Sequence, residues 1–188
     1  SYYIALIKRR SNVDAQIGLK KTGQLVLNEL LLEFNKSLKF ETAQKAVYSF
    51  LKAQEFQQKV DRVGVKLKIE EVYLNDFKEI RSRYLEQLYD EGTRLLEEQD
   101  FSTAEEKFKE IERLDENFKD SGQLKSIAIV EPLYRNAEKA LEEGHFRKAY
   151  DNCIQIEEHI ANYKETEYIK TESLERGLFT LAVIPFEN

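Results

Sequence analysis

Apolar residues recur at helical spacing along most of the chain, and this pattern predicts an α-helical protein. Between Ile17 and Leu38 they return every three or four residues, and the same spacing runs from about Lys78 to Gln99. Residues 63–77, between these stretches, are expected to form a connector. The chain contains only seven Gly and two Pro, too few for the many turns of an all-β protein. The predicted fold class is therefore all-α.

An internal repeat is the main feature of the second half. Residues 88–121 and 133–166 align without a gap at an offset of 45 residues, and 11 of the 34 aligned pairs are identical. A repeat of this kind predicts stacked units that bury a common core. The identical pairs are Leu88/Leu133, Tyr89/Tyr134, Leu96/Leu141, Glu97/Glu142, Glu98/Glu143, Phe101/Phe146, Ala104/Ala149, Ile111/Ile156, Glu112/Glu157, Asn117/Asn162 and Lys119/Lys164.

Each copy is expected to contain two helices separated by a short break. Gly92 and its counterpart Ala137 are small, so a neighbouring helix can approach the first helix closely. Residues 99–100 and 144–145 break the helix, and Ser102 is a candidate N-cap for the next one. The second helix is expected to bury one apolar set in each copy: Phe101, Ala104, Phe108 and Ile111, matched by Phe146, Ala149, Cys153 and Ile156.

The extra length of the repeat is assigned to a short third helix over 119–130, with Pro132 in the first turn of the helix that follows. A similar segment, 164–177, comes after the second copy. Residues 40–56 repeat the second-helix pattern more loosely. The predicted repeat domain therefore covers residues 1–177, with units at about 14–62, 79–130 and 131–177.

Each copy resembles the tetratricopeptide repeat. The matching positions are a small residue in the first helix (Gly92, Ala137), an aromatic residue at the turn (Phe101, Phe146) and an alanine early in the second helix (Ala104, Ala149). The period of 45 exceeds the 34 residues of that repeat. The resemblance implies an α-solenoid of stacked helical hairpins, with a short extra helix per repeat.

By this resemblance, the first helices line a groove that holds a protein or peptide. The implied groove residues are Glu86, Tyr89, Thr93, Glu97, Glu131, Tyr134, Glu138 and Glu142. Because five of the eight are glutamates, we expect a basic partner and salt-sensitive binding. The alternative role of Tyr89 and Tyr134 is packing between repeats.

Charge is distributed unevenly along the chain, whose net charge is −6. Residues 1–40 hold seven Lys/Arg against three Asp/Glu, whereas residues 79–120 hold seven against fourteen. Such a dipolar chain can steer a charged partner or stack head to tail with a second copy.

Residues that could support catalysis are isolated from one another. His145 and His159 have no metal-ligand spacing around them, and Cys153 occupies a predicted core position. Basic residues 8–10 lack the interleaved aromatic residues of a nucleic-acid site, and no apolar stretch is long enough to cross a membrane. We therefore expect a non-catalytic scaffold without cofactor or nucleic acid. The alternative is a rigid spacer or oligomerisation module that positions a following domain.

The C-terminal segment 178–188 changes period and favours a strand after Gly177. Its sequence LAVIPFEN is similar to the opening strand of a periplasmic domain family that includes curli-secretion lipoproteins and the amino-terminal domain of the Tol translocation protein. The resemblance implies that a further domain starts here, in a bacterial lipoprotein or other cell-envelope protein that is periplasmic or associated with the outer membrane. The absence of methionine likewise suggests a piece of a longer protein. On the residues alone, a cytoplasmic location stays open.

Overall fold

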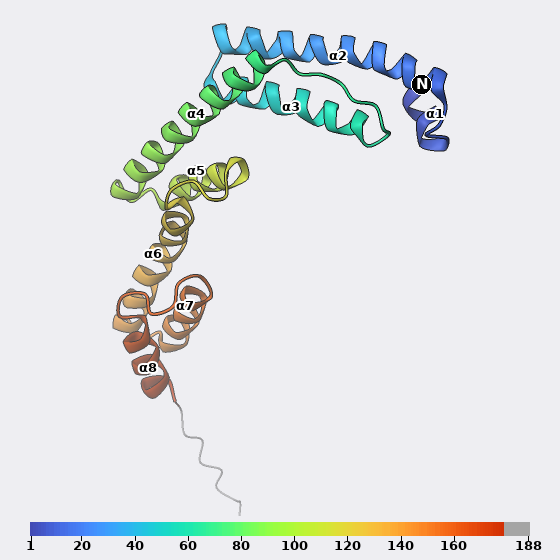
Figure 1. Ribbon diagram of the computed structural model, residues 1–188. Helices are drawn as coiled ribbons and strands as arrows, with labels where there is room; N and C mark the ends of the chain where they lie inside the picture. The colour runs from blue at the N-terminus through green and yellow to red at the C-terminus, as the bar shows by residue number, and fades with distance from the viewer. Residues whose placement is uncertain (179–188) are drawn as a thin grey trace, which may run out of the picture. The chain divides into compact units, whose positions relative to one another are not determined.

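The computed structural model describes residues 1–178, and every secondary-structure element in this range is an α-helix (Figure 1). Helices account for 80% of the described residues. The all-α prediction is therefore confirmed. The helices are α1 (Tyr2–Lys8), α2 (Val13–Phe40), α3 (Ala43–Asp61), α4 (Glu71–Glu97), α5 (Phe101–Leu114), α6 (Ser121–Glu142), α7 (Phe146–His159) and α8 (Thr166–Gly177).

Two compact units divide the chain, residues 1–87 (unit 1) and residues 88–188 (unit 2). Unit 1 contains α1, α2, α3 and the first part of α4. Unit 2 contains the end of α4 and helices α5 to α8.

A pair of long helices, α2 and α3, lies side by side and forms the body of unit 1 (Figure 1). The Thr42 hydroxyl accepts a hydrogen bond from the Lys45 amide and caps α3 at its start. The rings of Phe34 and Phe50 are fully buried and meet edge to face with centroids 5.1 Å apart. Phe77 of α4 stacks on Phe50 at 4.2 Å, so an aromatic contact ties the first turns of α4 to this pair.

Residues 65–69 of unit 1 lie between the turn that follows α3 and the start of α4, and we call this non-helical segment the strap. Every second side chain of the strap, such as the buried Leu67, faces inward. This two-residue alternation is typical of an extended chain. Gln24 of α2 donates to the Lys68 carbonyl (2.8 Å) and accepts from the Lys68 amide (2.9 Å). Gln57 of α3 donates to the Leu67 carbonyl (2.9 Å). Side-chain amides thus replace the backbone partners that a strand would have.

Helix α4 begins at Glu71, about two turns before the predicted start at Lys78. The prediction was wrong because it assigned all of 63–77 to one connector. The extended pattern ends at Ile69, and Phe77 already belongs to the helix, where its contact with Phe50 fixes it.

Helices α5 and α7 repeat one another at the offset of 45 residues. Both have 14 residues, and they start at Phe101 and Phe146. The turn before each contains a residue with positive φ, Gln99 at 65° and Gly144 at 76°. The two helices therefore have the same length and follow a positive-φ residue at the aligned position of the break.

The cap of α5 differs from the prediction. Asp100, rather than Ser102, precedes the first helical residue, and its carboxylate accepts a hydrogen bond from the Thr103 amide (3.3 Å). The helix starts two residues earlier than a cap at Ser102 predicts, because Phe101 already has helical geometry. An acidic N-cap also complements the helix dipole.

The contact between the first and second helices depends on a small residue in both copies. A Cβ atom added at Gly92 would lie 2.9 Å from Cζ of Phe108, whose side chain is fully buried. In the second copy, Ala137 and Cys153 occupy the equivalent positions within one buried cluster. In the second copy, the first helix thus has a larger residue than Gly92, and the second helix has a smaller residue than Phe108.

Helix α6 is one continuous helix of 22 residues with Pro132 inside it. The predicted separate helix over 119–130, with Pro132 opening the next, is therefore wrong. Proline has no N–H, so the Ala128 carbonyl lacks its helical donor, a loss of about 3 kcal/mol in a helix interior. Buried residues on both sides of the proline, such as Val130 and Tyr134, hold the helix together through contacts with α5 and α7.

The end of the described chain is α8, within the segment 164–177 that was expected to follow the second copy. The predicted strand and following domain at 178–188 lie, after Leu178, outside the described residues. Among the helices that the structure describes, none has the length and apolar character needed to cross a membrane.

The Gly92–Phe108 contact generates the first prediction. Gly92→Ala should lower the free energy of unfolding by about 1 kcal/mol, because overpacking costs about 1–3 kcal/mol while alanine gains about 1 kcal/mol of helix propensity over glycine. In a Phe108→Cys background, which reproduces the second copy, the same change should instead be stabilising by about 1 kcal/mol. Urea unfolding of the four proteins measures both effects. The same sign in both backgrounds would show that Phe108 does not restrict position 92.

Candidate functional site

The groove residues predicted in the first copy lie on α4, and the structure assigns them different environments. Glu86 and Glu97 are exposed. Thr93 is half-buried, and its hydroxyl donates to the carbonyl of Tyr89 one turn earlier (2.9 Å). The Tyr89 hydroxyl donates to the carboxylate of Asp120 (2.6 Å). Tyr89 therefore makes internal contacts in this structure.

An aromatic pair with a lysine over it occurs in both copies. The rings of Tyr89 and Phe118 meet edge to face at 6.1 Å, and Lys119 Nζ lies 4.4 Å from the Tyr89 ring centroid. The equivalent set in the second copy is Tyr134 and Tyr163, at 5.8 Å, with Lys164 Nζ 4.9 Å from the Tyr134 centroid. Both lysines have positive φ, at 48° and 43°. These cation–π contacts fix the loop after each second helix.

Glu131 of α6 is held by internal donors. Its carboxylate accepts from the Tyr163 hydroxyl, from Lys164 Nζ at 2.6 Å and from Arg135 Nε at 3.3 Å, and only 12% of its side chain is exposed. Burial raises the pKa of Glu131, but the hydrogen bonds from Lys164 and Tyr163 outweigh it, so that the pKa is lowered. The carboxylate is therefore ionised and already satisfied within the unit.

Tyr134 is buried at the α6–α8 contact. Desolvation, followed by a hydrogen bond to the Glu138 carboxylate, raises the pKa of its hydroxyl to about 12. The backbone of Glu165 also hydrogen-bonds this hydroxyl. Tyr134 thus positions Glu138 beside the start of α8.

Three of the predicted residues come together in a shallow pocket of about 230 Å³ between α6 and α8, which we call the acidic pocket. Glu138 and Glu142 are one helical turn apart and face the same side. Glu165 and the exposed Tyr168 of α8 complete the polar rim, and the floor is apolar. The lining residues are Tyr134, Glu138, Leu141, Glu142, Glu165, Tyr168 and Ile169.

The carboxylates of the acidic pocket have no cationic partner within the described part of the chain. Glu131, Glu143 and Glu157 nearby do form ion pairs, whereas Glu142 and Glu165 form none with residues 1–178. The sequence did not predict that Glu165 and Tyr168 belong to the site, because only the first helices were assigned to the groove. The signal was present, since Glu165 is the 45-residue equivalent of Asp120, which contacts Tyr89.

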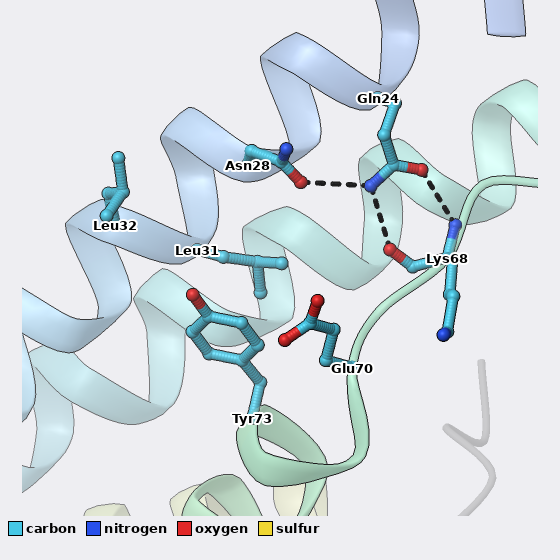
Figure 2. Close-up of a pocket in the computed structure, with 7 residues that line it drawn as sticks. All are labelled: Gln24, Asn28, Leu31, Leu32, Lys68, Glu70 and Tyr73. Carbon is cyan, nitrogen blue, oxygen red and sulfur yellow. Dashed lines mark hydrogen bonds between the residues drawn. The ribbon is translucent and has the colours of Figure 1, made fainter.

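Unit 1 contains a larger groove, of about 570 Å³, that the sequence did not predict. Figure 2 shows Leu31, Glu70 and Tyr73 at one end, with the amides of Gln24 and Asn28 at the other. Gln24 Nε2 donates both to Asn28 Oδ1 (2.9 Å) and to the strap. The groove was missed because the strap was taken as a simple connector.

The residues with catalytic potential differ in their exposure to solvent. Burial raises the pKa of the Cys153 thiol to about 11, which disfavours the reactive thiolate. His145 and His159 are exposed. Within residues 1–178, no group of His, Cys, Asp and Glu side chains has the arrangement of a metal site.

Comparisons with protein-family models, with curated proteins and with solved structures returned no match. The functional inference therefore depends on the geometry and electrostatics described above.

The Glu131 contacts generate a prediction about pH. Glu131→Gln should lower the free energy of unfolding by about 1–3 kcal/mol near pH 7, because it removes charge-assisted hydrogen bonds. The folded-state pKa lies below the unfolded value near 4.5, so the wild-type advantage is complete above that pH and is lost as the pH falls through the folded-state pKa. Urea unfolding of both proteins from pH 7 to pH 3 measures the difference. A difference that is constant with pH would contradict the role given to this carboxylate.

Proposed function

We propose that this protein is a non-catalytic, tetratricopeptide-like scaffold that binds a basic segment of a partner protein in the acidic pocket. The observation that carries the proposal is the pocket itself. It combines the carboxylates of Glu138, Glu142 and Glu165 with an apolar floor, and Glu142 and Glu165 form no ion pair within the described residues.

Repeated contacts in unit 2 support the repeat interpretation. Besides the aromatic–lysine sets, Lys125 pairs with Glu112 at 2.6 Å, and Lys170 pairs with Glu157 at the same distance. These pairs are again 45 residues apart. A chain that repeats its backbone turns, its small-residue contact and its ion pairs behaves as two copies of one structural unit.

The chemistry of the pocket favours a side chain with an apolar stem and a cationic head. The methylene groups of arginine or lysine can cover Leu141 and Ile169 while the head reaches the carboxylates. Arginine can also stack on Tyr168, which is 60% exposed. Such a contact adds specificity to the long-range attraction between a basic partner and the acidic unit 2.

The surrounding protein context is part of the proposal. The similarity of LAVIPFEN to envelope proteins supports a periplasmic or outer-membrane-associated parent protein, with the helical units as its interaction region. The uneven charge favours, as the second candidate, a module that positions the following domain by self-association.

A labelled hexa-arginine peptide tests the acidic pocket. In about 50 mM salt we expect saturable binding, measured by fluorescence anisotropy, that weakens steeply in about 500 mM salt because the contact is ionic. Glu142→Gln with Glu165→Gln should weaken binding about tenfold, since two of the three carboxylates lose their charge.

The matched control is Glu106→Gln with Glu116→Gln, which removes the same charge from exposed positions outside the pocket. Equal weakening by both double variants would mean that the peptide responds to net charge alone. That result would rule out the pocket as the binding site.

A further inference from the structure

Four aliphatic side chains of helix α2 are more than half exposed to solvent. Val13, Ile17, Leu25 and Leu32 are each between 58% and 64% exposed. At 3.6 residues per turn these four side chains lie within an arc of about 120° on one side of the helix. Most exposed apolar residues on a soluble surface are scattered singly, so four along one helix side indicate a contact surface.

This aliphatic face is also basic. Inside the arc lie the exposed Lys21 and Lys39 with one acidic residue, Asp14. The exposed Lys20 and Lys36 lie within about 20° of its two edges. We call these lysines together with the four aliphatic residues the basic face. Unit 1 as a whole has 16 Lys/Arg against 11 Asp/Glu.

The basic face does not complement itself. A two-fold contact between two such faces would bring lysines next to lysines, which is destabilising. Its complement in charge is unit 2, which has 13 Lys/Arg against 24 Asp/Glu. Unit 2 also exposes the apolar ring of Tyr168, at 60%, on the edge of the acidic pocket.

We propose that the partner of the acidic pocket is a second copy of this chain, whose basic face on α2 contacts α6 and α8 head to tail. The inference rests on the proposed function in that it uses the same pocket. Lys20 and Lys21 supply the cations, and the flanking Ile17 and Leu25 pack on the exposed ring of Tyr168 at the edge of the pocket.

A head-to-tail contact leaves one basic face and one acidic pocket unused at the ends of every assembly. Further copies can therefore add, to form open chains or a ring. The face of α2 is about 42 Å long and one helix wide, or about 400 Å² per copy, which is below the size of a stable interface. The association is therefore reversible and depends on concentration.

Sedimentation velocity of the whole chain tests the proposal. From about 10 to about 500 µM in 50 mM salt, the mean mass should rise beyond that of a dimer, and about 500 mM salt should abolish the rise. Lys21→Gln with Leu25→Gln should weaken association about tenfold, and Glu142→Gln with Glu165→Gln should do the same.

Mixing the two double variants gives the decisive result. Each variant alone has one weakened side in every contact, so it should associate about tenfold more weakly than the wild type, whereas an equimolar mixture retains one intact pair of surfaces. The mixture should form dimers and stop there. The matched control, Val72→Gln with Lys78→Gln, removes one exposed aliphatic group and one charge from elsewhere in unit 1 and should associate like the wild type.

Three results would overturn the inference. They are a wild-type protein that is monomeric over the whole range, a mixture that stays monomeric, and a monomeric protein whose basic face binds vesicles of anionic phospholipid. If the monomeric protein still binds hexa-arginine through Glu142, the proposed function stands without self-association. Loss of peptide binding as well would overturn both.

Discussion

The close approach of two helices at one small residue is the contact on which unit 2 depends. A first helix can lie against the ring of Phe108 only because Gly92 has no side chain, and the second copy keeps the same approach with Ala137 and Cys153. The extra methyl group on the first helix of the second copy is accommodated by a smaller residue on the second helix, so both contacts avoid overlap in a close-packed interior. The aromatic–lysine sets and the ion pairs of each copy are built around helices already placed by this contact.

Much of this arrangement could be predicted from the sequence. Helical periodicity identified α2 and the hairpins, and the repeat located the breaks at 99–100 and 144–145. The segments that failed were those in which local pattern competes with tertiary contact. Pro132 normally signals a helix start, yet contacts on both sides keep α6 continuous. The strap has a strand pattern but obtains its backbone partners from Gln24 and Gln57, which no local signal indicates.

The candidate site was predictable in part. The glutamates of α6 follow from helical geometry, so Glu138 and Glu142 could be assigned to one face. The surroundings of these glutamates could not be predicted, because the partners of a side chain come from elements distant in sequence. Glu131 lies on the same helix, but Tyr163 and Lys164 occupy its carboxylate, and this depends on the loop after α7. Helical geometry therefore predicts which carboxylates share a face of α6. Tertiary contacts decide which of them are free of internal partners and can bind a ligand.

The continuity of α6 has a consequence for cooperativity. This helix begins in the connection after the first copy and ends as the first helix of the second, so the copies share one hydrogen-bonded rod. In most repeat arrays, neighbours interact only across an interface and can fray one by one. Here, melting either copy would strip contacts from half of the shared helix. The two copies should therefore exchange amide hydrogens as one cooperative block, even though the missing donor at Pro132 is the weakest point of the shared helix.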